Sequence, residues 1–260
     1  MSTESPQKAK VVLYWLEKSR SQRILWLLEE LKIDYELKVF KRTEKMVAPP
    51  ELKEVHPLGK SPVIGVQAPE AEKPRIIAES GLIVEYLTEY FGKWLEPKKF
   101  AEGKEGQIGG ESEEWLRYRF FMHYAEGSLM TLMIVAFLMN NIETAPVPFF
   151  IKPITRGIVG KMNTAFLQPN FKTHLDFLED QLATSPNGGE FLCGPGLTGA
   201  DIMMIFPLEA AQWRAGLTKE KYPKLSAYIA RLQQREAFQQ AIKKIEDVTG
   251  EKYNPSLSSK

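Results

Sequence analysis

The chain has 260 residues, of which 43% are hydrophobic and 26% are charged, as in an ordinary folded globular protein. Its 34 Lys and Arg residues balance 33 Asp and Glu, so the net charge of +1 excludes a general attraction to nucleic acid or acidic membranes, and any anion recognition must be local. The single cysteine, Cys193, excludes an internal disulfide, and the three scattered histidines exclude a zinc-type ligand cluster. A polar start and the lack of eighteen consecutive apolar residues predict a cytoplasmic protein.

The first ninety residues carry alternating strand and helix patterns. Short apolar runs predict strands, and apolar residues at helical spacing predict helices between them. A β-α-β unit places its first two strands parallel in one sheet, and the next two strands form an antiparallel hairpin before a further helix. This order is the thioredoxin-like arrangement. The expected strands are 11–15, 35–40, 61–66 and 75–78, and the expected helices are 20–32, 51–55 and 79–91.

The rest of the chain is helical in pattern. A Gly-, Lys- and Glu-rich stretch after residue 93 is expected to be a linker. A long helix is marked by apolar residues from Trp115 to Met133, and further helices are expected at 171–182, 200–213, 222–232 and 236–245. The fold class is therefore an α/β domain followed by an all-α domain. The predicted boundaries are 1–93 for the first domain, 94–110 for the linker, 111–250 for the helical domain and 251–260 for a disordered tail.

Three motifs stand in an informative order. They are Ser19-Arg-Ser-Gln-Arg23 opening the first helix, His56-Pro-Leu-Gly-Lys-Ser-Pro62 entering the third strand, and Glu79-Ser80 opening the next helix. With the helical second half, the chain resembles the cytosolic glutathione transferase superfamily, and its texture is closest to yeast-type fungal members. The resemblance spans about Lys10 to Glu246. It implies an enzyme that binds glutathione in the first domain and joins the glutathione thiol to electrophiles.

The resemblance implies that the Ser61–Pro62 peptide bond is cis. Such a bond would present the N–H and C=O of Ser61 to the cysteinyl backbone of glutathione, as a peptide strand adds to a sheet edge. The alternative is a proline that only begins a strand, where its missing N–H does no harm. Lys60, beside this turn, is expected to reach the glycyl carboxylate.

Glu79 and Ser80 lie at a predicted helix N-terminus, where free N–H groups favour an anion. We expect Ser80 and these amides to hold the γ-glutamyl carboxylate, and Glu79 to pair with the γ-glutamyl ammonium. The alternative is that both residues only cap the helix. The two interpretations are compatible with each other.

Ser19 is the candidate activator of the thiol. A free thiol has a pKa of roughly 8.5, and a hydroxyl that donates to the sulfur favours the thiolate. Ser19 could instead be only the N-cap of the first helix. Tyr14 is the rival candidate and Ser21 a weaker one, while Arg23 is expected to support the structure through a buried ion pair. No cysteine lies between the first strand and helix, which excludes a mixed disulfide there.

The electrophile pocket is assigned to the helical domain, where His123, Tyr124 and Glu126 could face the cleft. The segment 140–170 is longer than the usual link at this place. It could cover the substrate pocket, extend a dimer contact or, over residues 146–162, touch a membrane surface, which the sequence does not favour. Thr198-Gly-Ala-Asp201 is a capping box in outline, and Cys193 is expected to be a loop or core residue.

The predicted function is a homodimeric glutathione transferase acting on largely apolar electrophiles, with peroxide reduction as a further activity. No cofactor beyond the cosubstrate glutathione and no metal are expected, and nucleic acid is not an expected partner. The alternative is a non-catalytic protein that uses the same fold to bind glutathione or another ligand, because one fold hosts unrelated functions.

Overall fold

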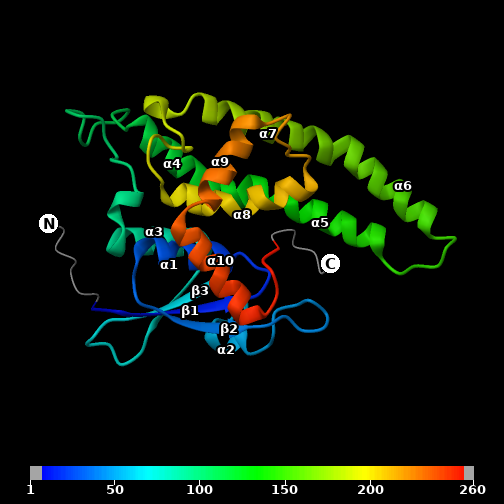
Figure 1. Cartoon of the computed structure of the whole chain (residues 1–260), viewed down its shortest axis with the longest axis horizontal. Coiled ribbons are helices and arrows are strands. Elements are labelled where there is room, and N and C mark those ends of the chain that lie inside the picture. Colours follow the sequence, from blue (N-terminus) through cyan, green and yellow to red (C-terminus); the bar gives the residue numbers. More distant parts are fainter. Residues whose placement is uncertain (1–7, 255–260) are drawn as a thin grey trace. The chain divides into compact units, whose positions relative to one another are not determined.

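The computed structural model describes residues 8–254, and these form two compact units. One unit contains the described residues up to Glu96 together with Leu232–Asn254, and the other contains Pro97–Arg231. The first is a small sheet with helices, and the second is entirely helical (Figure 1). The expected fold class, a thioredoxin-like domain followed by an all-α domain, is confirmed.

The first unit is built on four strands in the order β2-β1-β3-β4. β1 pairs parallel with β2, and β3 pairs antiparallel with β4, as the β-α-β and hairpin patterns predict. β1 also pairs antiparallel with β3, which joins the two halves of the sheet. The strands are β1 Lys10–Leu16, β2 Glu36–Phe40, β3 Val63–Gln67 and β4 Arg75–Ala78; the helices are α1 Ser21–Leu31, α2 Leu52–Val55, α3 Ser80–Phe91 and the short 3₁₀ helix η1 Lys93–Leu95.

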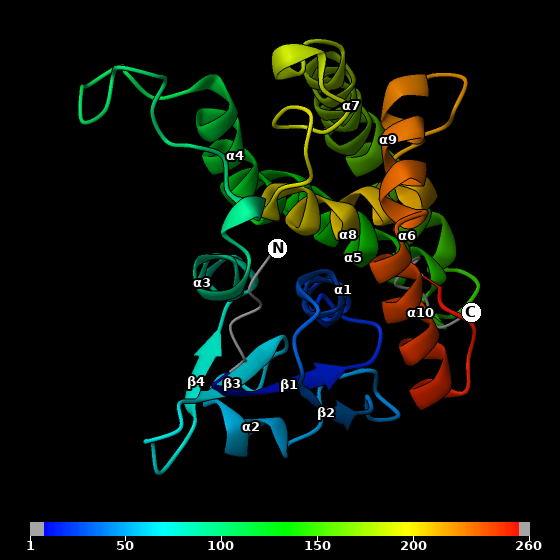
Figure 2. The same ribbon diagram turned by 60° about the vertical axis from the view of Figure 1, so that its left-hand side comes forward.

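The two faces of this sheet are unequally covered. Along β1, the side chains of Val11, Leu13 and Trp15 are buried, while those of Val12 and Tyr14 are only half-buried, because successive residues point to opposite faces. Figure 2 shows α1 and α3 on one face of the sheet and the short α2 on the other. The heavily buried face of β1 is therefore the one packed against long helices.

The last helix, α10 (Glu236–Thr249), belongs to the first unit although it follows the helical domain in the chain. The Phe238 ring meets the Trp26 ring of α1 edge-on, with 5.3 Å between the centroids. The Arg235 Nε donates to the Glu30 carboxylate at 3.0 Å. The predicted helical domain, residues 111–250, therefore extends too far along the chain, because a contact between α1 and α10 leaves no local pattern in the sequence.

The helical unit contains longer helices than the sequence predicts. The segment 140–170, for which the sequence left the structure open, is largely helical, and Pro153 sits in the first turn of α6, where a missing N–H costs nothing. The elements are α4 Glu113–Tyr124, the π-helical stretch η2 Ala125–Met130, α5 Thr131–Thr144, α6 Lys152–Met162, the π-helical stretch η3 Asn163–Leu167, α7 Gln168–Ala183, the 3₁₀ turn η4 Pro186–Gly188, α8 Gly199–Arg214 and α9 Pro223–Gln233.

The N-terminus of α8 is held by the predicted capping box. Asp201 is fully buried and accepts hydrogen bonds from the Thr198 N–H at 2.7 Å, the Thr198 hydroxyl at 2.9 Å and the Tyr228 hydroxyl at 2.6 Å. Cys193 is buried nearby, and burial raises the pKa of its thiol well above the ordinary value. Both residues are structural, as the sequence predicts.

The predicted disordered tail, 251–260, lies partly outside the described residues. In the part that the structure describes, the Tyr253 N–H donates to the Glu246 carboxylate at 3.0 Å. Residues 255–260 lie outside the described range.

Candidate functional site

The three motifs meet at one edge of the sheet. β1 and β4 end at this edge and β3 begins there, because Tyr14 pairs with Val63 and Val63 pairs with Ala78. The chain segments just beyond these strand ends carry Ser19, Ser61 and Ser80. Residues more than sixty positions apart are thus brought to a common place within the first unit (Figure 1).

The Ser61–Pro62 peptide bond is cis, as the resemblance implied. The β1–β3 ladder ends at the Tyr14–Val63 pair, and two residues further the same register would place Leu16 opposite Ser61. Leu16 instead receives its partners from α1: its N–H donates to the Ser21 hydroxyl at 3.2 Å, and its C=O accepts from the Ser21 hydroxyl at 3.0 Å. Within residues 8–254, no backbone hydrogen bond uses the N–H or C=O of Ser61, so both remain available to an added strand.

Ser19 belongs to a small hydroxyl cluster at the start of α1. Its Oγ donates to the Leu16 C=O at 2.7 Å, lies 2.7 Å from the Ser21 Oγ and accepts from the Ser21 N–H at 3.2 Å. The N-cap of α1 is Arg20, which makes no side-chain cap bond. Ser19 thus lies one residue before the N-cap of α1, and its hydroxyl accepts from the first N–H of the helix in addition to its bonds with Leu16 and Ser21.

Each hydroxyl hydrogen of this cluster has two possible acceptors. Ser19 and Ser21 both reach the Leu16 C=O, and either can donate to the other. If Ser21 keeps the Leu16 C=O, the hydrogen of the half-buried Ser19 can turn to another acceptor without leaving the carbonyl unpaired. The cluster thus permits Ser19 to donate to a ligand at this edge.

Glu79 and Ser80 form the N-terminus of α3, as predicted, but with an unusual backbone. Glu79 has φ 73° and ψ 121°, a region that costs a non-glycine residue about 1–3 kcal/mol and that is retained mainly at functional sites. Its exposed side chain makes no cap hydrogen bond to α3. Glu79 is therefore the N-cap of α3 by position, but its side chain does not cap the helix.

Ser80 is held in place from α1. It is only 5% exposed, and its Oγ accepts from the fully buried Arg23 guanidinium at 3.1 Å. Because the hydroxyl accepts from Arg23, its own hydrogen remains available for an anion at the helix N-terminus. From the sequence we expected Arg23 to be a structural residue, and no pattern predicted its contact with Ser80, because the two residues are 57 positions apart.

The two remaining candidates, Lys60 and Tyr14, lie on different sides of the sheet edge: Lys60 is beside the cis bond, and the Tyr14 ring is not. Lys60 is exposed immediately before the cis bond, and the Ser61 hydroxyl anchors this turn by donating to the Tyr14 C=O at 2.9 Å. The Tyr14 ring, however, lies on the sheet face that α1 and α3 do not cover. The Lys38 Nζ is 5.5 Å from the centre of this ring.

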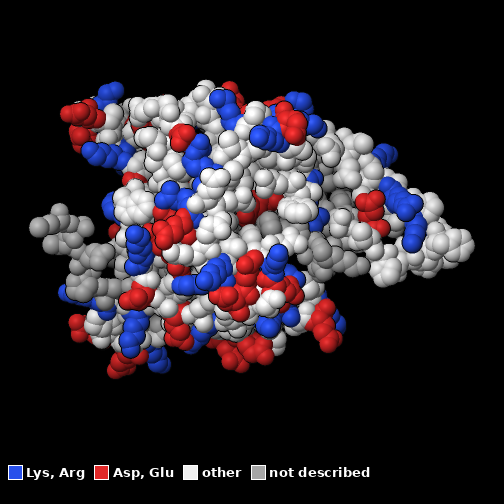
Figure 3. Space-filling model, in the orientation of Figure 1, with Lys and Arg blue, Asp and Glu red and all other residues white. Residues whose placement is uncertain are grey.

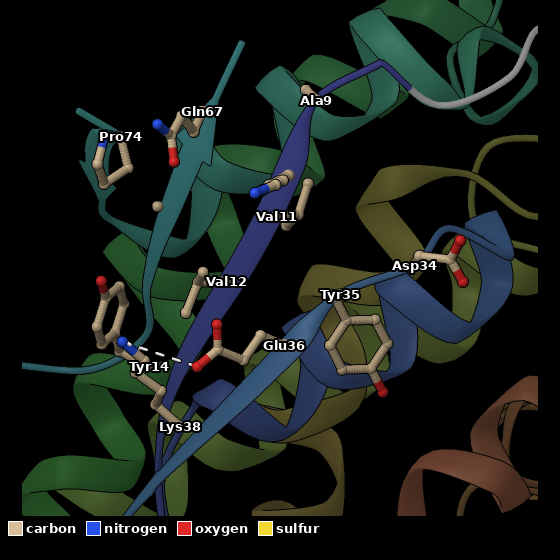
Figure 4. Close-up of a pocket in the computed structure, with 12 residues that line it drawn as sticks. Ala9, Val11, Val12, Tyr14, Asp34, Tyr35, Glu36, Lys38, Gln67 and Pro74 are labelled. Atoms are coloured by element: carbon tan, nitrogen blue, oxygen red, sulfur yellow. Dashed lines mark ion pairs between the residues drawn. The ribbon is translucent and has the colours of Figure 1, made fainter. Parts of the chain in front are cut away.

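Tyr14 lines an open pocket of about 610 Å³ on this second face, together with residues of β1, β2 and β3. Figure 4 shows Tyr14, Lys38 and Gln67 around this pocket, with an ion pair of 3.7 Å between Lys38 and Glu36. The predicted glutathione-binding residues do not line it.

The three predicted electrophile residues do not share a surface. His123 is exposed, Glu126 is half-buried, and Tyr124 is buried with its hydroxyl 2.5 Å from the His174 Nδ1. Burial raises the pKa of Tyr124 and lowers the pKa of His174, so both are neutral partners near pH 7. The sequence did not predict that His174 is the partner of Tyr124, because the two residues are 50 positions apart on different helices.

Tyr124 also packs in an aromatic cluster. Its ring stacks on Phe120 at 5.3 Å and lies 5.8 Å from Phe177, both centroid distances. The four-residue spacing from Phe120 to Tyr124 indicates a shared helix face. Within the described residues, no group of three or more His, Cys, Asp or Glu side chains could hold a metal ion.

Comparison with known families concerns both units. The sequence matches the family described as glutathione S-transferase, N-terminal domain, over residues 19–89, and that described as glutathione S-transferase, C-terminal domain, over residues 161–231. The chain belongs to the glutathione S-transferase family. The resemblance drawn from the three motifs is therefore confirmed, and the N-terminal match contains Ser19, the Ser61–Pro62 turn and Glu79-Ser80.

Individual transferases are similar over most of their length. Glutathione S-transferase 1 of Saccharomyces cerevisiae is 33% identical over 228 residues, which are 88% of this chain and 92% of the yeast protein. Glutathione S-transferase 3 of Schizosaccharomyces pombe is 31% identical over 239 residues, 92% of this chain and 89% of that protein. The expected similarity of the motif sequences to yeast-type transferases agrees with both of these relatives.

Solved transferase structures share the fold. A glutathione S-transferase from Actinobacillus pleuropneumoniae superposes with a TM-score of 0.63 at 25% identity, covering 95% of this chain and 98% of its own. A glutathione transferase from Phanerochaete chrysosporium, solved with oxidized glutathione, gives 0.66 at 14% identity and covers 96% and 100%. At this identity the second similarity shows the fold alone.

Proposed function

We propose that this family member is an active glutathione transferase that binds glutathione at the sheet edge between Ser19, Ser61 and Ser80. It joins the glutathione thiol to largely apolar electrophiles and uses the same thiol to reduce organic peroxides. The observation that carries this proposal is the unpaired N–H and C=O of Ser61 beside the cis bond. A tripeptide can pair with both groups as an added strand, and this fixes its cysteinyl residue in register.

The two ends of glutathione then meet opposite polar groups. The γ-glutamyl carboxylate lies at the N-terminus of α3, where the Ser80 hydroxyl and free N–H groups donate to it. The γ-glutamyl ammonium pairs with the exposed Glu79 carboxylate, and the glycyl carboxylate pairs with Lys60. The unusual φ of Glu79 supports this assignment, since such strain persists where a ligand needs it.

The thiol lies next to Ser19 in this arrangement. We assign Ser19 as the donor that stabilises the thiolate. Ser21 is a positioning residue, because its hydroxyl donates to the Leu16 C=O when the Ser19 hydroxyl donates to the sulfur. Tyr14 is the less favoured candidate, because its ring faces the sheet surface opposite α1. No other cofactor is needed for this chemistry, since the thiol itself is the nucleophile.

Replacing Ser19 with alanine tests this role. We expect the pKa of bound glutathione to rise, and turnover at neutral pH to fall about tenfold for each pKa unit that leaves the thiol protonated. The loss should shrink at high pH, where the thiol ionises unaided. Ultraviolet titration of the bound thiolate measures the pKa directly, beside a pH–rate profile.

Tyr14→Phe is the matched control, because it also removes one hydroxyl, from a residue of β1 whose ring lies on the other face of the sheet. An unshifted thiolate titration in Ser19→Ala would show that backbone amides and water suffice. A shift in Tyr14→Phe alone would make Tyr14 the activator.

A non-catalytic glutathione-binding protein is the second candidate. It is favoured by one observation: the Ser19 hydroxyl has the Leu16 C=O as an acceptor at 2.7 Å and can remain there. Retention on glutathione resin together with turnover of chlorodinitrobenzene and cumene hydroperoxide supports the enzyme. Retention without turnover of either compound supports the binding protein.

The electrophile site belongs to the helical unit in this proposal, and its apolar residues suit apolar substrates of the kind removed in detoxification. Of the three predicted residues, the exposed His123 and the half-buried Glu126 are retained as candidates. Tyr124 is assigned to the aromatic cluster instead. A cytoplasmic location is part of the proposal and is supported by the single buried thiol, which suits a reducing compartment.

We further propose a homodimer with two-fold symmetry. α3 exposes Leu82 and Tyr90, and α4 exposes Leu116 and Phe120, large apolar side chains that a partner subunit would cover. Light scattering at micromolar concentration should give twice the mass of one chain, and Leu116→Glu should shift the protein to the monomer. A monomeric wild-type protein would contradict the assignment.

A further inference from the structure

The α5–α6 hairpin, residues 131–167, exposes two apolar stripes. A spacing of four residues keeps side chains close to one face of a helix. At the tip between the helices, Phe149 is 83% exposed. The exposed members are Ile134, Leu138 and Ile142 on α5, and Phe150, Ile154, Ile158, Met162 and Phe166 along α6 and its continuation.

The fold does not account for these stripes. The hairpin is anchored by other side chains, among them Leu132, Met133, Val159 and Leu167, all of which are buried. Figure 1 shows the tip of the hairpin extending past the ends of the other helices of the helical unit. Contiguous apolar surface of this kind on a folded protein marks an interaction site.

Basic residues outnumber acidic ones on the hairpin, where Glu143, exposed in the last turn of α5, is the single acidic residue of 131–167. Between Thr144 and Leu175 the sequence has no acidic residue, while Lys152, Arg156 and Lys161 are all exposed on α6. Figure 3 shows Lys and Arg side chains along this part of the helical unit, with one acidic patch beside them and uncharged atoms at the tip. The chain as a whole has a net charge of only +1, so this local excess is hidden in the composition.

We propose that the α5–α6 hairpin docks on an anionic lipid bilayer, with Phe149 and Phe150 inserted at the interface and the α6 cations among the headgroups. Aromatic and aliphatic side chains beside Lys and Arg are the features of helices that lie in a membrane interface. Cations near an anionic surface add about 1 kcal/mol each, which is about fivefold in affinity.

Two other arrangements fit less well. A second copy on the same surface would bring the three α6 cations toward their own copies, with Glu143 as the one acidic residue of the hairpin to offset them, since a two-fold contact pairs a patch with its own copy. A spanning helix is the other arrangement. Among the described residues one helix, Glu113–Thr144, is long and apolar enough to cross a bilayer, but half of its most apolar window is buried inside the structure.

Vesicle co-sedimentation of the full chain tests the proposal. We expect binding to vesicles of phosphatidylcholine with phosphatidylserine, and weak binding to phosphatidylcholine alone. Replacing Lys152, Arg156 and Lys161 together with Gln should lower the affinity for the anionic vesicles about a hundredfold. The double variant Phe149→Ser with Phe150→Ser should lower it about tenfold or more on both vesicle types.

Matched controls come from the linker, where Ile108 and Lys104 are also exposed. Ile108→Ser and Lys104→Gln should leave vesicle binding unchanged, and all variants should keep the wild-type melting temperature and turnover, because the replaced side chains are exposed. Equal sedimentation with and without anionic vesicles would overturn the proposal. It would also be overturned if the Phe variant changed the oligomeric mass in the absence of lipid, since the occupant would then be a second copy.

Discussion

Replacing Ser80 with alanine should raise the Michaelis constant for glutathione by roughly 10- to 150-fold. The variant removes a charge-assisted hydrogen bond to the γ-glutamyl carboxylate, and such a bond contributes about 1.5–3 kcal/mol. It also removes one acceptor of the Arg23 guanidinium, which donates to the Ser80 hydroxyl at 3.1 Å. Steady-state kinetics with glutathione as the varied substrate measure the effect.

Thr88→Ala is the matched control for this prediction. Thr88 lies on the same helix, α3, is equally buried, and donates to the Val84 C=O at 2.8 Å. Its loss should lower the melting temperature without changing the Michaelis constant for glutathione. If Ser80→Ala lowers only the stability, as Thr88→Ala is expected to do, the carboxylate site is misplaced.

Glu79→Gly extends the same argument to the backbone. Glycine adopts the φ of 73° without a steric penalty, so the variant should be at least as stable as the wild type. It should nevertheless bind glutathione more weakly, because the carboxylate that pairs with the γ-glutamyl ammonium is gone. A gain in stability with a loss of affinity would show that the strain at Glu79 serves the ligand.

Replacing Asp201 with alanine should lower the free energy of unfolding by about 3–5 kcal/mol, the largest stability effect expected for a single substitution here. The carboxylate is fully buried and accepts from the Thr198 N–H and hydroxyl and from the Tyr228 hydroxyl. Its removal leaves these donors unpaired in the interior. Chemical denaturation followed by tryptophan fluorescence measures the change.

Two further substitutions serve as comparisons for Asp201→Ala. Tyr228→Phe removes one donor and should cost about 1–3 kcal/mol, whereas Asp247→Ala, at an exposed position of α10, should stay within about 0.5 kcal/mol of the wild type. If Asp201→Ala were as mild as Asp247→Ala, the capping box would not hold the helical unit together. Glutathione affinity of the folded Asp201 variant should be unchanged, since this residue is not part of the sheet edge.

The sequence predicts the four strands, the parallel pair β1–β2 and the hairpin β3–β4 well, because strand and helix periods differ and the β-α-β connection fixes the parallel pair. It also places the Ser61–Pro62 turn and the start of α3. It does not predict that the Ser21 hydroxyl binds both the N–H and the C=O of Leu16. Because Leu16 is paired in this way, the N–H and C=O of Ser61 are left without a backbone partner in the described part of the chain. That arrangement depends on where α1 begins relative to β1, which no local pattern records.

Other differences have equally specific causes. The sequence left the structure of residues 140–170 open, and Pro153 lies where α6 begins and is compatible with a helix. The contact of Phe238 with Trp26 assigns α10 to the first unit through an interaction across more than two hundred positions. The positive φ of Glu79 could not be predicted from the sequence, because glutamate rarely adopts this backbone conformation.

The central claim is that glutathione adds as a strand to Ser61, and amide hydrogen exchange at that residue tests it most directly. The Ser61 N–H has no partner among the described residues, so it should exchange quickly in the free protein. Saturating glutathione should slow the exchange at Ser61 and at the first amides of α3, while the amides around Asp201 remain unchanged. Protection at these positions is the predicted result; unchanged exchange at Ser61 under saturating glutathione would contradict the account.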